Sequence, residues 1–251
     1  MQKRTALRFV MGIASLSLAS EGVFAACSDV GRSDLIDEAQ AIVPGDGGGG
    51  PNGGLDFPMW VTVVDETGKV CHVVNTNGPG DNSDAAWLGS RVISAQKANT
   101  ANAFSHNTFA LSTANLYSAV QPGDSLFGLQ HSNPVDASRA YQGSPNSYGT
   151  NGDPLKNKRI GGVNVFGGGL ALYDDGGEKI GAIGVSGDTS CTDHVVAWKI
   201  REALGLDNVP AGVGSSGKDE LIQPAGLGTF GHPTCLNNPD NTEDGGSIDG
   251  N

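Results

Sequence analysis

The sequence predicts an α+β domain built on an antiparallel sheet. Three short runs are β-branched or apolar, and glycines or a polar turn separate them, which is typical of successive strands: residues 160–166, 170–173 and 179–186. The hydrophobic period then changes, because Val196, Ile200 and Leu204 recur at helical spacing. A meander that feeds its last strand into a helix is an α+β pattern.

The start of this helix is glycine-rich and polar. Ser190 is the expected N-cap, with Asp193 three residues on, and Gly205 supplies the stop. Backbone N–H groups left free at a helix start, together with the positive end of the helix dipole, favour an anionic group. The sequence therefore predicts that Gly187 and Thr189 help to bind a polar or anionic ligand.

A hairpin is predicted earlier in the chain, where residues 60–64 and 69–74 flank the turn Asp65-Glu66-Thr67-Gly68. In its second strand His72 shares one face with apolar neighbours. His72 is either a half-buried residue with a satisfied hydrogen bond or a ligand on the sheet surface, and the first reading is favoured.

Further elements follow from the same patterns. Residues 33–43 and 87–104 read as helices, and in the second one alanines recur every three residues and allow close packing on a sheet. Residues 111–120 are expected to form a third helix and residues 125–130 a strand, with His131 at its end.

Two cations of the second helix, Arg91 and Lys97, are candidates to meet the carboxylates of a ligand. Solvated surface charge is the commoner fate of such residues.

The N-terminus has the features of an export signal. Basic residues precede the apolar run 9–19, and small residues up to Ala25 suit a signal peptidase. The run is too short to cross a bilayer and no later one is longer, so no transmembrane helix is expected. A periplasmic or secreted location follows, and a lipid anchor at Cys27 is the less favoured alternative.

The chain contains 4 cysteines, and in an oxidising compartment two disulfides are the default expectation. Cys191 opens the last helix and Cys235 lies beyond it, so these two are predicted to pair. By elimination, Cys27 is expected to bridge to Cys71.

Charge and motifs exclude several classes of function. The formal net charge is −12, which makes nucleic acid and anionic membranes poor partners. Nucleophile-elbow, phosphate-loop and zinc motifs are absent from the sequence. An aspartate-rich start of a calcium loop near residue 240 lacks the closing glutamate, so calcium is not expected.

Composition shifts divide the chain into four parts. They are a signal peptide (1–25), an N-terminal helix with a Gly-rich linker (26–58), the main domain (59–205) and an irregular C-terminal extension (206–251). The polar segment 133–158 is long for a connection in a compact domain, and such loops often serve as lids or oligomer contacts.

The main domain resembles the GlcG/HbpS-like family. The resemblance rests on GGVNVFGGG, residues 161–169, followed by GAIGVSGDTSCTDH, residues 181–194. VVDETGKV, GSRVISAQKANTANAF and SLFGLQHSNP precede them in the family's order. The resemblance implies a profilin-like fold, a five-stranded antiparallel sheet flanked by helices, and a homo-oligomer.

The family's studied members bind haem. The resemblance therefore implies an exported module that holds haem or a similar flat, carboxylate-bearing small molecule. Two alternatives remain open: a redox or haem-modifying enzyme, and a structural oligomer subunit without a ligand.

Candidate iron ligands are ranked by their position in the predicted fold. His194, in the first turns of the last helix, comes first because the helix dipole disfavours its protonation. His131 is second and His72 third. Gly187 and Thr189, assisted by Arg91 or Lys97, are expected to receive a haem propionate.

Overall fold

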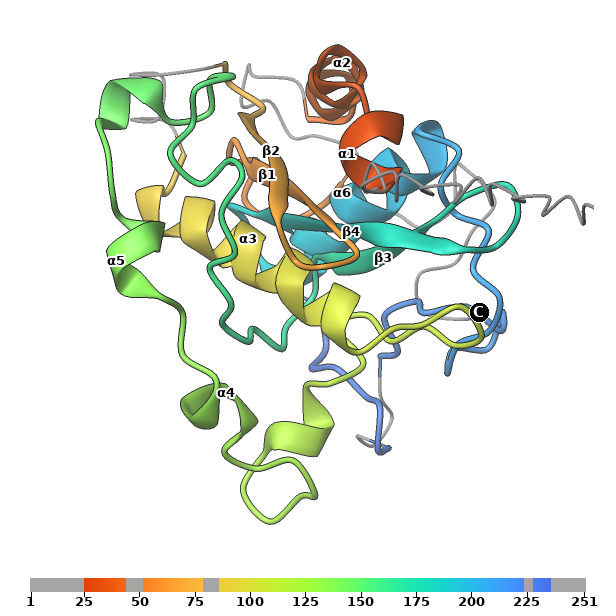
Figure 1. Cartoon of the computed structure of the whole chain (residues 1–251). Coiled ribbons are helices and arrows are strands. Elements are labelled where there is room, and N and C mark those ends of the chain that lie inside the picture. Colours follow the sequence, from red (N-terminus) through yellow and green to blue (C-terminus); the bar gives the residue numbers. More distant parts are fainter. Residues whose placement is uncertain (1–24, 44–51, 79–85, 224–227, 236–251) are drawn as a thin grey trace, which may run out of the picture.

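The computed structural model describes residues 25–43, 52–78, 86–223 and 228–235. Most of the predicted signal peptide and Gly-rich linker, and the acidic tail, lie outside them. The described elements are shown in Figure 1. They are α1 (Ala25–Asp29), α2 (Arg32–Ile42), β1 (Trp60–Asp65), β2 (Val70–Asn75), α3 (Leu88–Ala103), η2 (Ser118–Val120), α4 (Leu129–Ser132), α5 (Ala137–Ala140), η3 (Pro145–Ser147), β3 (Gly169–Tyr173), β4 (Lys179–Ser186) and α6 (Ser190–Ala203).

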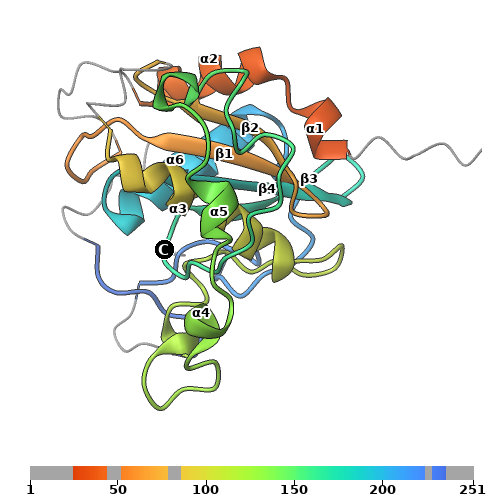
Figure 2. The same ribbon diagram turned by 60° about the vertical axis from the view of Figure 1, so that its left-hand side comes forward.

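The four strands of the described chain form one antiparallel sheet in the order β2-β1-β4-β3. Helix α3 covers one face, while α6, α1 and α2 cover the other (Figures 1 and 2). Successive side chains of each strand point to opposite faces, so both faces are apolar. Val61 and Val63 pack toward α6, whereas Trp60 and Val64 pack toward α3. The α+β class predicted from the sequence is confirmed.

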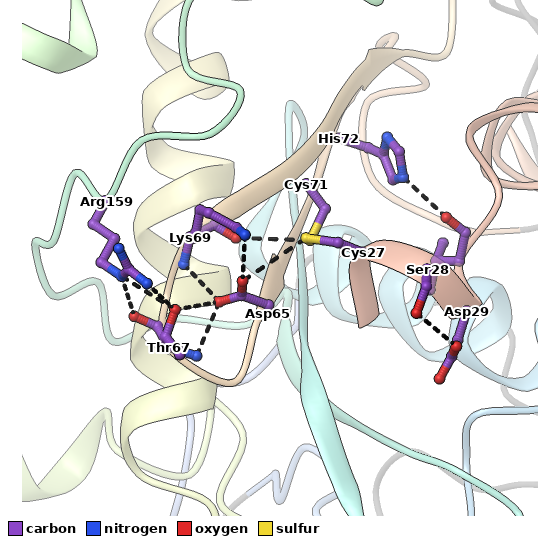
Figure 3. The surroundings of a disulfide bond; sticks show 10 residues. Cys27, Ser28, Asp29, Asp65, Thr67, Lys69, Cys71, His72 and Arg159 are labelled. Atoms are coloured by element: carbon purple, nitrogen blue, oxygen red, sulfur yellow. Dashed lines mark hydrogen bonds and ion pairs between the residues drawn. A yellow bond between two sulfur atoms is a disulfide. The ribbon is translucent and has the colours of Figure 1, made fainter. Parts of the chain in front are cut away.

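The hairpin turn between β1 and β2 forms because Asp65 ties it together. Its Oδ1 atom accepts hydrogen bonds from the backbone N–H groups of Thr67 at 2.9 Å and Lys69 at 3.0 Å (Figure 3). Gly68 has a φ of 77°, which favours glycine. The turn fixes the register that pairs Trp60 with Asn75.

The predicted close packing of α3 on the sheet is confirmed, and it depends on Gly184 of β4. A Cβ atom added at Gly184 would lie 2.0 Å from the carbonyl oxygen of Ser94 and 2.5 Å from the backbone nitrogen of Ala98. Ala95, Ala98 and Ala101 are fully buried between the helix and the sheet. Small residues on both partners therefore let the helix backbone approach the strand.

The Gly184→Ala variant is expected to lose about 1 to 3 kcal/mol of unfolding free energy, because α3 must move away from β4. Denaturant unfolding measures this loss. Gly89→Ala is the matched control on α3, since nothing lies within 4 Å of its added Cβ atom. That variant should be neutral or gain up to about 1 kcal/mol. Equal stability of the two variants would contradict the tight contact.

The sheet differs from the expected one in having four strands, not five, among the described residues. Residues 160–166 make only one isolated bridge there, between Val135 and Gly161. Gly161 and Gly162 have φ values of 62° and 83°, which break an extended run. Residues 125–130 are not a strand either, because Gly128 has a φ of 91° and is the N-cap of the short helix α4.

The predicted helix 111–120 is also wrong, except for the 3₁₀ turn η2 at its end. The Asn115 side chain accepts hydrogen bonds from Ser112 at its N–H and its hydroxyl, at 3.0 and 2.8 Å. The Ser112 hydroxyl accepts in turn from the Asn115 N–H at 3.3 Å. Such local bonds offer the backbone an alternative to helical pairing, so the segment folds as turns.

Both predicted disulfides are present. Cys27 joins Cys71, which ties α1 to β2 with a Cα–Cα separation of 5.0 Å (Figure 3). Cys191 joins Cys235, which ties α6 to the C-terminal extension at 5.7 Å. Within the described part of the chain, no helix is long and apolar enough to cross a membrane.

Candidate functional site

The link from β4 to α6 is where the sequence places the ligand. Thr189, not Ser190, is the N-cap of α6, and its hydroxyl accepts from the Thr192 N–H at 3.3 Å. The Ser190 hydroxyl lies instead 3.0 Å from Nε2 of His232. The predicted cap is therefore displaced by one residue, and this leaves Ser190 to contact the extension.

The backbone donors of this link are not free for an anion. Oδ1 of Asp193 accepts from the N–H groups of Gly187 at 3.0 Å and Asp188 at 2.9 Å. The Thr189 N–H donates to the Asp188 carboxylate. The chain thus supplies its own anion at the predicted position, and Gly187 and Thr189 are not available to a propionate in this arrangement.

Lys97 completes this buried network. Its ammonium lies 2.7 Å from Oδ2 of Asp193 and donates to the Val185 carbonyl at 3.0 Å. Burial lowers the pKa of Lys97, while burial, opposed by Lys97, raises the pKa of Asp193 to about 6. The pair connects α3 to the start of α6, so Lys97 is neither a solvated surface charge nor a free ligand group.

Arg91 is also part of a buried ion pair. It donates to Asp153 through Nε at 3.0 Å and through Nη2, and its guanidinium stacks on the Tyr148 ring at 3.7 Å. It further donates to the Ala140 carbonyl at 3.2 Å. Arg91 therefore holds the long polar segment 133–158 against α3 and is not positioned to meet a ligand.

His194 lies in the first turns of α6, as predicted, and is completely buried. Neither ring nitrogen has a hydrogen-bond partner. Burial lowers the pKa of His194 well below its ordinary value. Electrostatic interaction with His232, Arg201 and Lys97 lowers this pKa further. His194 is therefore a neutral imidazole at pH 7 with an unused lone pair, which is the form that binds a metal.

Gly167 and Trp198 pack close to the buried His194 side chain. A Cβ atom added at Gly167 would lie 2.9 Å from the Cβ atom of His194, so the glycine segment before β3 packs directly on it. The half-buried Trp198 ring lies one helical turn on, with its centroid 6.3 Å from that of His194. Any ligand that reaches His194 must displace part of this cover.

The structure does not bring the other two predicted histidines to His194. His131 is exposed on α4, in an arm that both views place far from α6 (Figures 1 and 2). His72 lies on β2, where its Nε2 atom is 2.9 Å from the Val30 carbonyl oxygen (Figure 3). His72 is a strand residue with one hydrogen bond, as the favoured reading expects, but it is buried (9% exposed) and its Nδ1 atom has no partner.

The extension contributes a further buried histidine, His232, which is not among the three ranked candidate ligands. It is 2% exposed, its ring centroid lies 5.5 Å from that of Tyr117, and its Nδ1 atom is 2.9 Å from the Pro233 carbonyl oxygen. Burial lowers its pKa to about 4, so the ring is neutral at pH 7. In the sequence, the only sign that His232 lies near the Cys191–Cys235 disulfide is its position three residues before Cys235.

One surface hollow of about 360 Å³ lies between α2 and α6. It is open and mixed in charge, and Glu38, Ile42, Lys199, Glu202 and Ala203 line it. None of the predicted site residues takes part, so this hollow adds nothing to the candidate site.

The fold and the buried network at the β4–α6 link define a small α+β domain with a buried histidine near the start of its last helix. A family model described as "Haem degrading protein HbpS-like" matches residues 54–201. The chain therefore belongs to the HbpS-like family. This confirms the resemblance on which the sequence analysis relied.

Solved structures of similar fold are remote. Klebsiella pneumoniae protein ORFY is 24% identical over 70% of this chain and 90% of its own, with a TM-score of 0.45. A PduOC:heme complex is 25% identical over 70% and 94%, with a TM-score of 0.47. A double mutant of Streptomyces reticuli HbpS is 15% identical over 80% and 99%, with a TM-score of 0.40. No curated protein sequence matches the chain.

Proposed function

We propose that this protein binds haem, or a similar flat molecule that carries a metal and carboxylates, with His194 as the metal ligand. The observation that carries the proposal is the buried, neutral imidazole whose two ring nitrogens lack partners. Buried polar groups are normally hydrogen-bonded, so an orphaned histidine calls for a function. Family membership supplies the class of ligand, and iron in haem accepts a neutral imidazole.

The residues around His194 provide a metal-binding atom for such a ligand but also block access to it. His194 offers the required donor atom, while the cover of Gly167 and Trp198 must open for it to be used. Lys97, Arg91, Gly187 and Thr189 are engaged with the protein's own groups and are therefore removed from the proposed ligand set. The carboxylates of the ligand must find other partners.

Haemin titration of purified protein, followed by the Soret band, tests the proposal. His194→Ala should weaken haemin binding by at least about tenfold and shift the Soret maximum, because an iron ligand is lost. His131→Ala is the matched control and should behave as wild type, since His131 is exposed on the remote arm. Circular dichroism of each variant checks that the fold is retained.

Imidazole added to His194→Ala gives a second readout. The free base should enter the space left by the ring and restore part of the haemin affinity. Wild-type affinity and an unchanged Soret maximum in both alanine variants would exclude His194 as the ligand. Absence of a Soret shift in the wild-type protein would exclude haem binding itself and favour a structural subunit.

A second candidate function is haem degradation, and the description of the family favours it. Loss of the Soret band after a reductant is added in air would support an enzyme, whereas a stable band would support a binding module.

We also propose that the protein is exported and self-associates. The two disulfides agree with an oxidising compartment. Light scattering that gives the mass of a single chain at micromolar concentration would exclude the oligomer, and retention of the protein in the cytoplasm would exclude export.

A further inference from the structure

The Cys191–Cys235 disulfide lies beside a buried histidine. The ligand atoms of Cys191, His232 and Cys235 all lie within 4.8 Å of one another. Cys191 is 3% exposed and His232 is 2% exposed, whereas Cys235 is partly buried, so the group is open to solvent on the Cys235 side only. No comparable group of three such side chains surrounds Cys27–Cys71 in the described part of the chain.

The position of His232 does not depend on the disulfide alone. Its backbone N–H donates to the Ile222 carbonyl at 2.9 Å, and the neighbouring Gly231 carbonyl accepts from the Ser118 hydroxyl at 2.7 Å. The ring is held between Ser190 and the Pro233 carbonyl. Breaking the S–S bond therefore leaves the imidazole beside the two sulfur atoms.

We propose that reduction of the Cys191–Cys235 disulfide converts this cluster into a binding site for a thiophilic divalent cation such as Zn²⁺. A dithiol reductant supplies two electrons and two protons, its own sulfurs form a disulfide, and Cys191 and Cys235 become thiols. The cation then displaces both thiol protons and binds two thiolates and the His232 ring. Two cysteines and one histidine, with water as the fourth ligand, form a known tetrahedral zinc set.

The surroundings of His232 suit this role. The Nδ1 atom of His232 lies 3.9 Å from Sγ of Cys191. In the oxidised protein Nδ1 donates its proton to the Pro233 carbonyl oxygen 2.9 Å away. When Nδ1 binds the cation, this hydrogen bond is given up and the ring proton moves to Nε2, which then donates to the Ser190 hydroxyl 3.0 Å away. A metal-bound histidine commonly donates its other N–H group to such a partner, which orients the ring. The oxidised protein lacks thiolates, so cation affinity follows the redox state.

Cobalt(II) titration tests the inference, because thiolate ligation gives a charge-transfer band in the near ultraviolet and tetrahedral geometry gives visible bands. The wild-type protein is compared before and after reduction. Two double variants, Cys191→Ser/Cys235→Ser and Cys27→Ser/Cys71→Ser, are titrated after the same reduction. Each keeps two of the four cysteines, so the number of thiols is matched. Circular dichroism reports the fold of every sample.

The reduced wild type and Cys27→Ser/Cys71→Ser should each bind one cobalt ion, while the oxidised wild type and Cys191→Ser/Cys235→Ser should bind none. His232→Asn should weaken cobalt binding in the reduced protein by at least about tenfold, since loss of even an outer partner costs 10- to 100-fold. The inference is overturned if the reduced wild type shows no thiolate band, whether folded or not. Equal binding by the two double variants overturns it as well.

Discussion

Replacing Asp219 by alanine is expected to lower the unfolding free energy by about 3 to 5 kcal/mol, because it leaves the Arg201 guanidinium buried without a counter-charge. Both side chains have 0% exposure. Two hydrogen bonds join them, at 2.8 and 3.0 Å, and Arg201 also donates to the Ala171 carbonyl at 3.2 Å. Its guanidinium also lies over the Trp198 ring at 4.6 Å.

Asp207→Ala is the matched control for this prediction. Asp207 pairs with Lys218 at 3.1 Å in the same extension, but both side chains are about one-third exposed, at 33% and 35%. Its removal should cost less than about 1 kcal/mol. Urea unfolding of both variants measures the contrast. A loss for Asp219→Ala no greater than that for Asp207→Ala would show that the Arg201–Asp219 pair does not stabilise the fold.

A third variant separates the cost of an unpaired charge from the loss of the pair. Arg201→Met/Asp219→Leu removes both charges and keeps apolar volume, so its stability should return to within about 2 kcal/mol of wild type.

The sheet and helices were predictable where local pattern and tertiary packing agree. The β-branched runs of β1 and β4 bury both faces, and the alanines of α3 fit the space above Gly184. Local sequence pattern gave wrong predictions for residues 111–120, 125–130 and 160–166. There, glycines with positive φ and side-chain bonds to the backbone outweigh hydrophobic spacing, and a sequence pattern does not report either one.

The candidate site was harder to predict, because contacts between distant residues decide it. Lys97 and Asp193 are 96 positions apart, and nothing near either residue indicates that they meet in the core. The sequence predicts only a helix-capping role for Asp193. In the structure its carboxylate accepts hydrogen bonds from backbone N–H groups at the helix start, where the sequence predicted a bound ligand. The prediction for His194 relied on the helix dipole, whereas burial is the main cause of its lowered pKa in the structure. His232 comes close to α6 only through the folding of the extension.

Replacing Lys97 by methionine is expected to destabilise the protein by about 3 to 5 kcal/mol at pH 8, with a smaller loss at pH 5. Methionine keeps the apolar stem but leaves Asp193 as an unpaired buried carboxylate. Burial already raises the pKa of Asp193 to about 6, above the ordinary value of 3.8, and loss of the ammonium raises it further. A raised folded-state pKa contributes stability at low pH that is lost as pH rises through that value.

The double variant Lys97→Met/Asp193→Asn provides the control. Asparagine keeps an oxygen that accepts from the N–H groups of Gly187 and Asp188 but carries no charge. Denaturant unfolding at pH 5, 6.5 and 8 should therefore show a steep fall in stability with pH for Lys97→Met and little fall for the double variant. Parallel pH profiles for the two would mean that Asp193 stays ionised without Lys97, so that the two backbone N–H donors suffice to hold its charge in the core.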